Sequence, residues 1–237
     1  MRGGLPARLV SLVGGLFLFA LAIVLLLESR LGLSPWDVLN QGIARHSPLS
    51  FGAANVAVGL AVLVLAWALG APPGVGRVAN AVLVGTFIQL LTSIDGISRL
   101  ASDPLDVRIG LLAAGIALVG PASAFYIGAD PRDTLMLVGA LRTHRRVGVV
   151  RAALEVTALA AGIVLGGTFG VGTVAFALLV GPVVQTSFAQ LARSPLAQSA
   201  PVPVVHGVHE DDREPGDGGN PALALGRGRA CGADADA

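Results

Sequence analysis

Several residue types that carry charge or chemistry are scarce in this chain. Its 237 residues include one cysteine, Cys231, and no lysine, so all sixteen basic residues are arginine. A single cysteine excludes an internal disulfide and a cysteine-based metal cage. Charged residues make up 13% of the chain, whereas a soluble domain is nearer a quarter charged. The net charge of +1 gives no indication of nucleic-acid binding.

Catalytic signatures are also missing from the sequence. It contains no HExxH, no GxSxG and no P-loop pattern, which are the signatures of zinc proteases, serine hydrolases and nucleotide-binding proteins. The carboxylates inside apolar segments are too few to supply a paired acid and base. We therefore expect a protein that is not an enzyme and that has neither a cofactor nor a metal site.

The chain contains instead long apolar runs, with 54% hydrophobic residues and a mean hydropathy of +0.75. A helix that crosses a bilayer needs about 20 mostly apolar residues. Six segments fit, and the lipid bilayer is then the expected partner: 9–27, 51–70, 78–94, 109–128, 149–166 and 173–190. The third and sixth are the weakest, so five spans is the alternative. The first is followed by Glu28-Ser29-Arg30 rather than a cleavage site, which favours a span over a signal peptide.

We expect one membrane domain, residues 1–193, followed by a tail, 194–237, that is rich in Pro, Gly, Ala and Asp and has the composition of a disordered segment. Arginines near the ends of the spans predict the orientation. With both termini in the cytoplasm, the inner segments hold eight of these arginines and the outer loops four. The sequence predicts a multi-pass membrane protein with this topology and leaves its oligomeric state open.

The two halves of the membrane domain are related in sequence. A shift of 96 residues aligns GLSPWDVL (32–39) with GADPRDTL (128–135) and gives 20 identities over 58 ungapped positions. The matches include Pro, Asp and Gln, residue types that would seldom match by chance in a chain of this composition. We therefore expect two repeats, at about 9–94 and 109–190.

Three spans per repeat is an odd number, so the second repeat should be inverted relative to the first. Inverted repeats recur in secondary transporters, where the working site lies near the midplane between the halves. The predicted fold is an all-α polytopic bundle of two inverted three-helix repeats. The alternative is that inversion only makes a stable pseudo-symmetric bundle.

Each repeat carries a helix-start motif directly after its first span. Ser34 or Asp130 at the N-cap, followed by Pro35 or Pro131 at the first helical position, opens a helix, and Asp37 and Asp133 suit its positive N-terminal end. We expect short amphipathic helices at about 34–46 and 130–142. They either lie flat or shallow in the membrane, which we favour, or dip back into it with their N-termini toward an anion or a polar solute.

Other polar residues fall within the expected spans. Arg151 and Glu155 lie four residues apart on one helix face and are expected to form an ion pair. Ionisable groups at membrane depth indicate function, although Arg151 could instead extend to the interface. Gln89 and Gln185 are equivalent positions of the repeats, and interhelical hydrogen bonding is the alternative explanation for both.

These motifs, together with GGTFGVGT and the Gly181-Pro182 pair after it, resemble the YczE/YyaS/YitT family of bacterial integral membrane proteins. The resemblance covers about 9–192, and the absence of a soluble C-terminal domain makes the chain more similar to the YczE branch. It implies a plasma-membrane protein of a family mostly without assigned biochemistry. Some members are linked to secondary-metabolite regulation, and transport has been suggested for the family.

Two functions follow from these observations. The first is a small transporter or channel-like protein for an unidentified small-molecule solute, with a polar cavity where the halves meet. The second is a non-enzymatic membrane scaffold or regulator that acts through partner proteins, with the basic segment 142–146 as the contact or as an anchor to anionic lipid.

Overall fold

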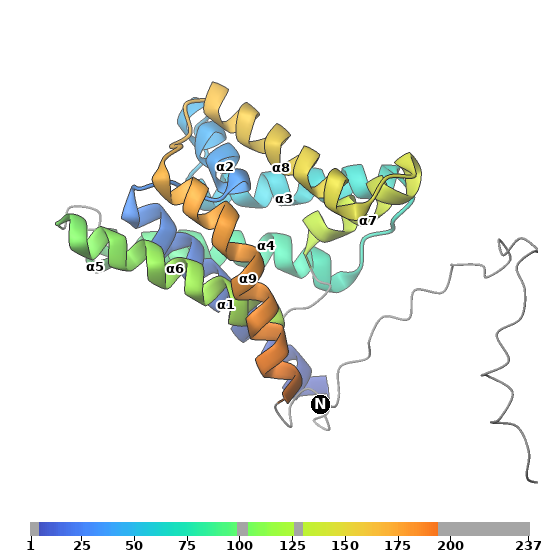
Figure 1. Ribbon diagram of the computed structural model, residues 1–237, viewed down its shortest axis with the longest axis horizontal. Helices are drawn as coiled ribbons and strands as arrows, with labels where there is room; N and C mark the ends of the chain where they lie inside the picture. The colour runs from blue at the N-terminus through green and yellow to red at the C-terminus, as the bar shows by residue number, and fades with distance from the viewer. Residues whose placement is uncertain (1–4, 99–103, 126–129, 194–237) are drawn as a thin grey trace, which may run out of the picture. The chain divides into compact units, whose positions relative to one another are not determined.

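The apolar runs of the sequence form the long helices of the structure, a computed structural model that describes residues 5–98, 104–125 and 130–193. All regular elements among these residues are helices (Figure 1). The long ones are α1 (Leu5–Ser29), α3 (Phe51–Ala68), α4 (Val75–Thr92), α6 (Leu105–Phe125), α8 (Val147–Val164) and α9 (Val171–Arg193). The short ones are α2 (Pro35–His46), α7 (Pro131–Thr143) and the one-turn α5 (Asp95–Ser98), which the sequence does not predict.

Five of these helices are long and apolar enough to cross a membrane: α1, α3, α4, α6 and α8. The sixth expected span falls in α9, whose apolar stretch Val171–Ser187 is shorter than the others. Large apolar side chains such as Val64, Val156 and Leu178 are exposed, as expected where lipid rather than water surrounds a helix. The chain is therefore an all-helical polytopic membrane protein.

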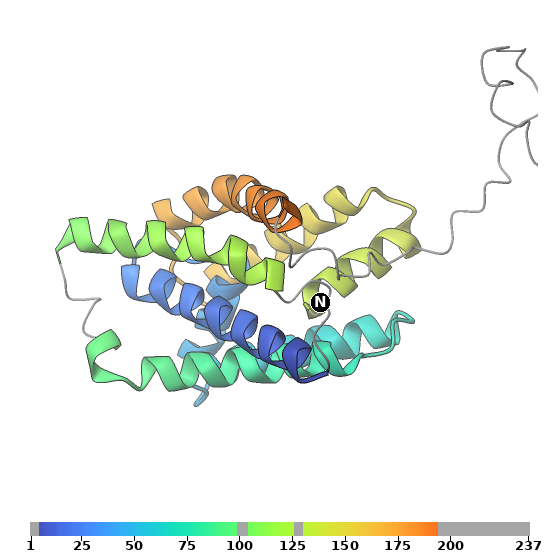
Figure 2. The same cartoon turned by 90° about the horizontal axis from the view of Figure 1, so that it is seen from below.

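Each half contains the same order of elements, and the helices pack in corresponding pairs. In the first half α1 packs against α4, and in the second α6 packs against α9, while α1 and α6 pack against each other. Figure 2 shows α1 and α6 side by side. Leu16, Val84 and Ile88 are buried where α1 meets α4.

The short helices pack against the opposite half. α2 lies against α8, and the equivalent helix α7 lies against α3. Glycines allow the first of these contacts, because a Cβ atom at Gly162 would lie 2.5 Å from the amide nitrogen of Leu39. Gly70 and Gly166 have φ of +100° and +72° and occupy equivalent positions just after α3 and α8. This conformation favours glycine at helix ends.

All the described residues belong to one unit, Met1–Ala200. The expected disordered tail, 194–237, lies outside the described residues, as do Gly128 and Ala129 of the second motif.

Candidate functional site

The first motif caps α2 as its sequence predicts. Pro35 is the first helical residue, and the Ser34 hydroxyl oxygen accepts a hydrogen bond from the Asp37 amide at 3.3 Å. The same hydroxyl donates to the Asp37 carboxylate at 2.5 Å, and the Asn40 side-chain amide donates to the other carboxylate oxygen at 3.3 Å. Asp37 is 2% exposed. The N-terminal end of α2 is thus neutralised by its own side chains.

The second motif also caps its helix, α7, with a bond to the second residue on rather than the third. Pro131 is the first helical residue, and the Asp130 carboxylate accepts a hydrogen bond from the Arg132 amide at 2.8 Å. Asp133 lies in the first turn of the helix, as Asp37 does in α2. Its side chain, however, is exposed where that of Asp37 is buried.

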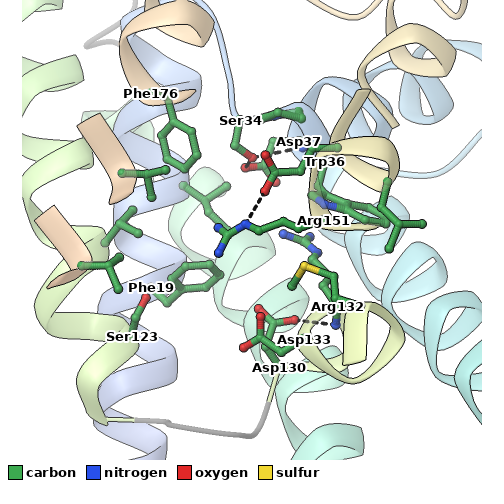
Figure 3. A pocket seen from close by; sticks show the side chains of 18 of the residues that line it. Phe19, Ser34, Trp36, Asp37, Ser123, Asp130, Arg132, Asp133, Arg151 and Phe176 are labelled. Carbon is green, nitrogen blue, oxygen red and sulfur yellow. Dashed lines mark hydrogen bonds and ion pairs between the residues drawn. The ribbon is translucent and has the colours of Figure 1, made fainter. Parts of the chain in front are cut away.

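The N-terminal ends of α2 and α7 meet at one cavity of about 300 Å³ (Figure 3). The remainder of the lining comes from α1, α6, α8 and α9. Its polar residues are Ser34, Asp37, Ser123, Asp130, Arg132, Asp133, Arg151 and Glu155, and its aromatic residues are Phe19, Trp36 and Phe176. The motifs, 96 residues apart in sequence, therefore form a single site.

The α2 helix is more deeply buried than a helix lying flat on the membrane surface would be. Its residues Asp37, Val38 and Asn40 are at most 2% exposed, and the helix packs against both α3 and α8. A helix lying on the membrane surface would keep a polar face in water. The short helices instead direct their N-terminal ends inward, toward the cavity.

Equivalent residues of the two motifs contact each other in this cavity. The Arg132 guanidinium carbon lies 5.1 Å from the centroid of the Trp36 ring, within the range of a cation–π interaction. Position 132 corresponds to position 36 under the shift of 96 residues, so this contact joins equivalent positions of the two motifs.

The expected ion pair of α8 is present on the cavity wall. The Arg151 Nε atom lies 2.9 Å from the Glu155 Oε1 atom, with the two side chains 52% and 35% exposed. An exposed i,i+4 pair contributes only about 0.3–0.5 kcal/mol in water. The pair therefore does little to hold α8 together, and both side chains are accessible from the cavity.

The C-terminal ends of the two short helices lie at opposite ends of α8. Arg45, in the last turn of α2, donates hydrogen bonds to the carbonyl of Gly166 and to the Thr168 hydroxyl, both beyond the C-terminus of α8. Arg142, in the last turn of α7, donates to the carbonyl of Leu69 at the end of α3, and α8 begins four residues after α7 ends. With 18 residues, α8 is about 27 Å long.

The charges around the cavity favour a positive partner. Four carboxylates, those of Asp37, Asp130, Asp133 and Glu155, face two guanidinium groups, those of Arg132 and Arg151. The two helix N-termini would attract an anion, but Ser34 and Asp130 already accept hydrogen bonds from them. Among the described residues, no group of three or more His, Cys, Asp and Glu side chains is arranged to hold a metal ion.

The structure brings together most of the predicted residues but not the two glutamines. Gln89 on α4 and Gln185 on α9 are exposed and do not line the cavity. Sequence analysis missed Phe19, Phe176 and Met136, which do line it. No signal in the sequence distinguishes these three from other apolar residues of membrane helices.

Comparisons with known proteins identify relatives along most of the chain. The profile of the family of unknown function DUF6198 matches residues 6–188. An uncharacterized protein of Haemophilus influenzae is 35% identical over 189 residues, covering 76% of this chain and 85% of its own length. The uncharacterized membrane protein YczE of Bacillus subtilis is 31% identical over 201 residues, covering 80% and 89%. This confirms the resemblance to the YczE branch. No solved structure matches.

Proposed function

We propose that this chain, which belongs to the DUF6198 family and is a helical membrane protein, carries a small polar solute across the bilayer. The observation that supports the proposal is the meeting of two repeated helix starts at one cavity of about 300 Å³. Solute sites in secondary transporters commonly lie between repeats, where the ends of short or broken helices face the substrate. We propose Asp37, Asp133 and Glu155 as the carboxylates of this site.

The proposal includes an inverted arrangement of the repeats, with α9 as the sixth span. Its support is that α2 and α7 begin at the same cavity and end at opposite ends of α8, which is one of the membrane-spanning helices. Opposite ends of a spanning helix lie at opposite membrane faces. Two short helices that start together and end on opposite faces are related by inversion.

The proposed solute is a small cation or zwitterion. The cavity has more carboxylates than guanidinium groups, and the Trp36 ring already holds one cation, the Arg132 guanidinium. An aromatic face beside carboxylates is suited to an ammonium or guanidinium group. The apolar walls formed by Phe19 and Phe176 would fit a short hydrocarbon portion of the solute.

Solute flux into proteoliposomes tests this function. Labelled methylammonium, guanidinium, glycine and nitrate serve as probes of the cationic, zwitterionic and anionic classes. We expect flux of a cationic or zwitterionic probe above that of empty liposomes, and at least a tenfold loss of it in Glu155→Ala. Gln89→Ala is the matched control, because Gln89 is an exposed polar residue away from the cavity.

The results distinguish the parts of the proposal. Flux of nitrate alone would contradict the assigned solute class. Flux that is unchanged in Glu155→Ala would remove Glu155 from the site. The absence of flux for every probe would instead favour the scaffold or regulator.

The second candidate, a membrane regulator acting through a partner protein, is supported by one surface feature. His144, Arg145 and Arg146 are consecutive and exposed between α7 and α8. Such a basic segment is suited to an acidic partner or to anionic lipid. Replacing both arginines with glutamate should abolish recovery of a co-purifying partner while leaving solute flux intact if this is the contact.

A further inference from the structure

The two halves differ at one corresponding pair of helices. α3 and α4 pack closely, because a Cβ atom at Gly52 would lie 2.5 Å from the Gly85 carbonyl oxygen. The equivalent glycines of the second half are Gly148 and Gly181, and a Cβ atom at either would meet nothing within 4 Å. Figure 1 shows α8 and α9 diverging from the short loop that joins them. The same glycine positions are therefore tightly packed in the first half and surrounded by open space in the second. We call α3 and α4 the closed pair, and α8 and α9 the open pair.

The open pair lines the cavity and the closed pair does not. α8 contributes Arg151, Leu154 and Glu155, and α9 contributes Phe176, Val180 and Val184, whereas no residue of α3 or α4 is part of the lining. The cavity is therefore lined by the separated pair, α8 and α9.

Two polar groups in the closed pair have no partner. Asn55 on α3 and Asn80 on α4 are 4% and 6% exposed, and the side-chain nitrogen of each donates no hydrogen bond. A buried amide without a partner is costly, and it requires an explanation. Under the shift of 96, Asn55 corresponds to Arg151 and Asn80 to Phe176, and both of these counterparts line the cavity.

We propose that the protein has a second conformation in which α3 and α4 separate, α8 and α9 close, and Asn55 and Asn80 line the same cavity from the other side. The exchange is suggested by the repeat, because the glycines at which α3 meets α4, Gly52 and Gly85, recur in α8 and α9 as Gly148 and Gly181. The amides of Asn55 and Asn80 then bond to water or solute. This inference rests on the proposed transport function and supplies its alternating access.

In the second conformation the solute meets a different set of groups. The counterpart of Glu155 is Gly59 and that of Arg151 is Asn55. The α3–α4 side therefore offers neutral amides where the α8–α9 side offers an ion pair. A cationic solute is held more weakly there, so this face is suited to release or low-affinity capture.

Thiol accessibility tests the second conformation without depending on solute flux. In a Cys231→Ser background, Asn55→Cys is labelled with a membrane-impermeant maleimide, with and without the additional pair Glu155→Cys and Ala177→Cys oxidised to a disulfide. Their counterparts Gly59 and Ala81 are in contact in the closed pair, where a Cβ atom at Gly59 would lie 3.1 Å from the Ala81 Cβ. A disulfide requires Cα atoms within about 7 Å, a separation that we expect when α8 and α9 close. Ala66→Cys is the control, because Ala66 is 1% exposed and packs against α7.

We expect the disulfide to form and the labelling rate of Asn55→Cys to rise at least fivefold, while Ala66→Cys stays unreactive. A disulfide that does not form, or one that forms and leaves Asn55→Cys as unreactive as Ala66→Cys, would overturn the inference. Increased labelling without flux of any probe would leave the second conformation standing and remove the transport function.

Discussion

The Arg132 guanidinium lies over the ring of Trp36, its own counterpart in the other repeat, at 5.1 Å from the ring centroid. The two residues occupy equivalent positions of the motifs, 96 residues apart in the sequence. The contact also shows how the repeats have diverged. One motif supplies an aromatic face and the other supplies a cation, so the pair is complementary where identical residues would not be.

Removing the tethered cation should strengthen binding of a free one. In a Trp67→Phe background, Trp36 is the sole tryptophan, and its emission reports on the cavity. We expect Arg132→Gln to lower the apparent Kd for guanidinium by about 2- to 30-fold, the range that corresponds to a cation–π interaction of about 0.5–2 kcal/mol. Titration of Trp36 fluorescence measures this change.

The control for that titration is Arg45→Gln, which removes an arginine that does not line the cavity. It should leave the Kd unchanged. Weaker guanidinium binding in Arg132→Gln would mean that Arg132 organises the site rather than competing for it.

The caps of α2 and α3 offer a matched pair of serines. Ser34 and Ser50 each accept a hydrogen bond from the amide three residues later, at 3.3 and 3.2 Å. Ser34 is buried and also bonds the buried Asp37 carboxylate, whereas Ser50 is exposed. We expect Ser50→Ala to lower the free energy of unfolding by about 1 kcal/mol and Ser34→Ala by about 2–3 kcal/mol, because Asp37 loses a partner.

Thermal unfolding in detergent checks this pair, since about 1 kcal/mol shifts the Tm by about 2–4 °C in a chain of this size. Equal shifts for the two variants would show that the Ser34–Asp37 bond adds nothing to the cap.

Local features of the site could be predicted from the sequence because they depend on neighbouring residues. The Ser-Pro and Asp-Pro helix starts predict α2 and α7 to within one residue at each end. The spacing of Arg151 and Glu155 predicts their ion pair. The ungapped shift of 96 likewise places equivalent elements in the same order in both halves.

The meeting of the two motifs could not be predicted in the same way. The alignment of the two halves identifies equivalent residues, but it does not indicate how far apart these residues lie in the structure. Gln89 and Gln185 match as well as Asp37 and Asp133 do, yet the glutamines lie away from the cavity. The difference depends on which helix faces turn inward, and uniformly apolar helices give little periodic signal of this.

The connections after the short helices provide the sharpest test of inversion. Leu49, between α2 and α3, is 39% exposed, and Arg145, between α7 and α8, is exposed. In a Cys231→Ser background, we expect an impermeant thiol reagent to label Leu49→Cys from outside intact cells and Arg145→Cys only in inverted vesicles. Asp37 and Asp133 would be poor reporters, because both line one cavity. Labelling of both connections from the same side would make the repeats parallel.

Alanine substitutions at two equivalent glycines should distinguish an effect on helix packing from an effect on the proposed conformational change. Both Gly85 and Gly181 lie inside helices, where alanine gains about 0.5–1 kcal/mol of intrinsic propensity. At Gly85 the new methyl group would lie 2.6 Å from the Gly52 carbonyl oxygen, whereas at Gly181 it meets nothing within 4 Å. We expect Gly85→Ala to lower the free energy of unfolding by about 1–3 kcal/mol and Gly181→Ala to leave it unchanged or slightly raised, measured as Tm in detergent.

Flux should then respond in a way that stability does not predict. In the present structure, the methyl group of Gly85→Ala clashes with the backbone of α3. If α8 and α9 close during the transport cycle as proposed, the methyl group of Gly181→Ala would clash with the backbone of α8 in the same way. Gly181→Ala should therefore slow solute flux severalfold although its Tm is preserved. Gly110→Ala is the control, because it also adds a methyl group in open space, near the start of α6. Full flux in Gly181→Ala would mean that α8 and α9 never approach as closely as α3 and α4 do.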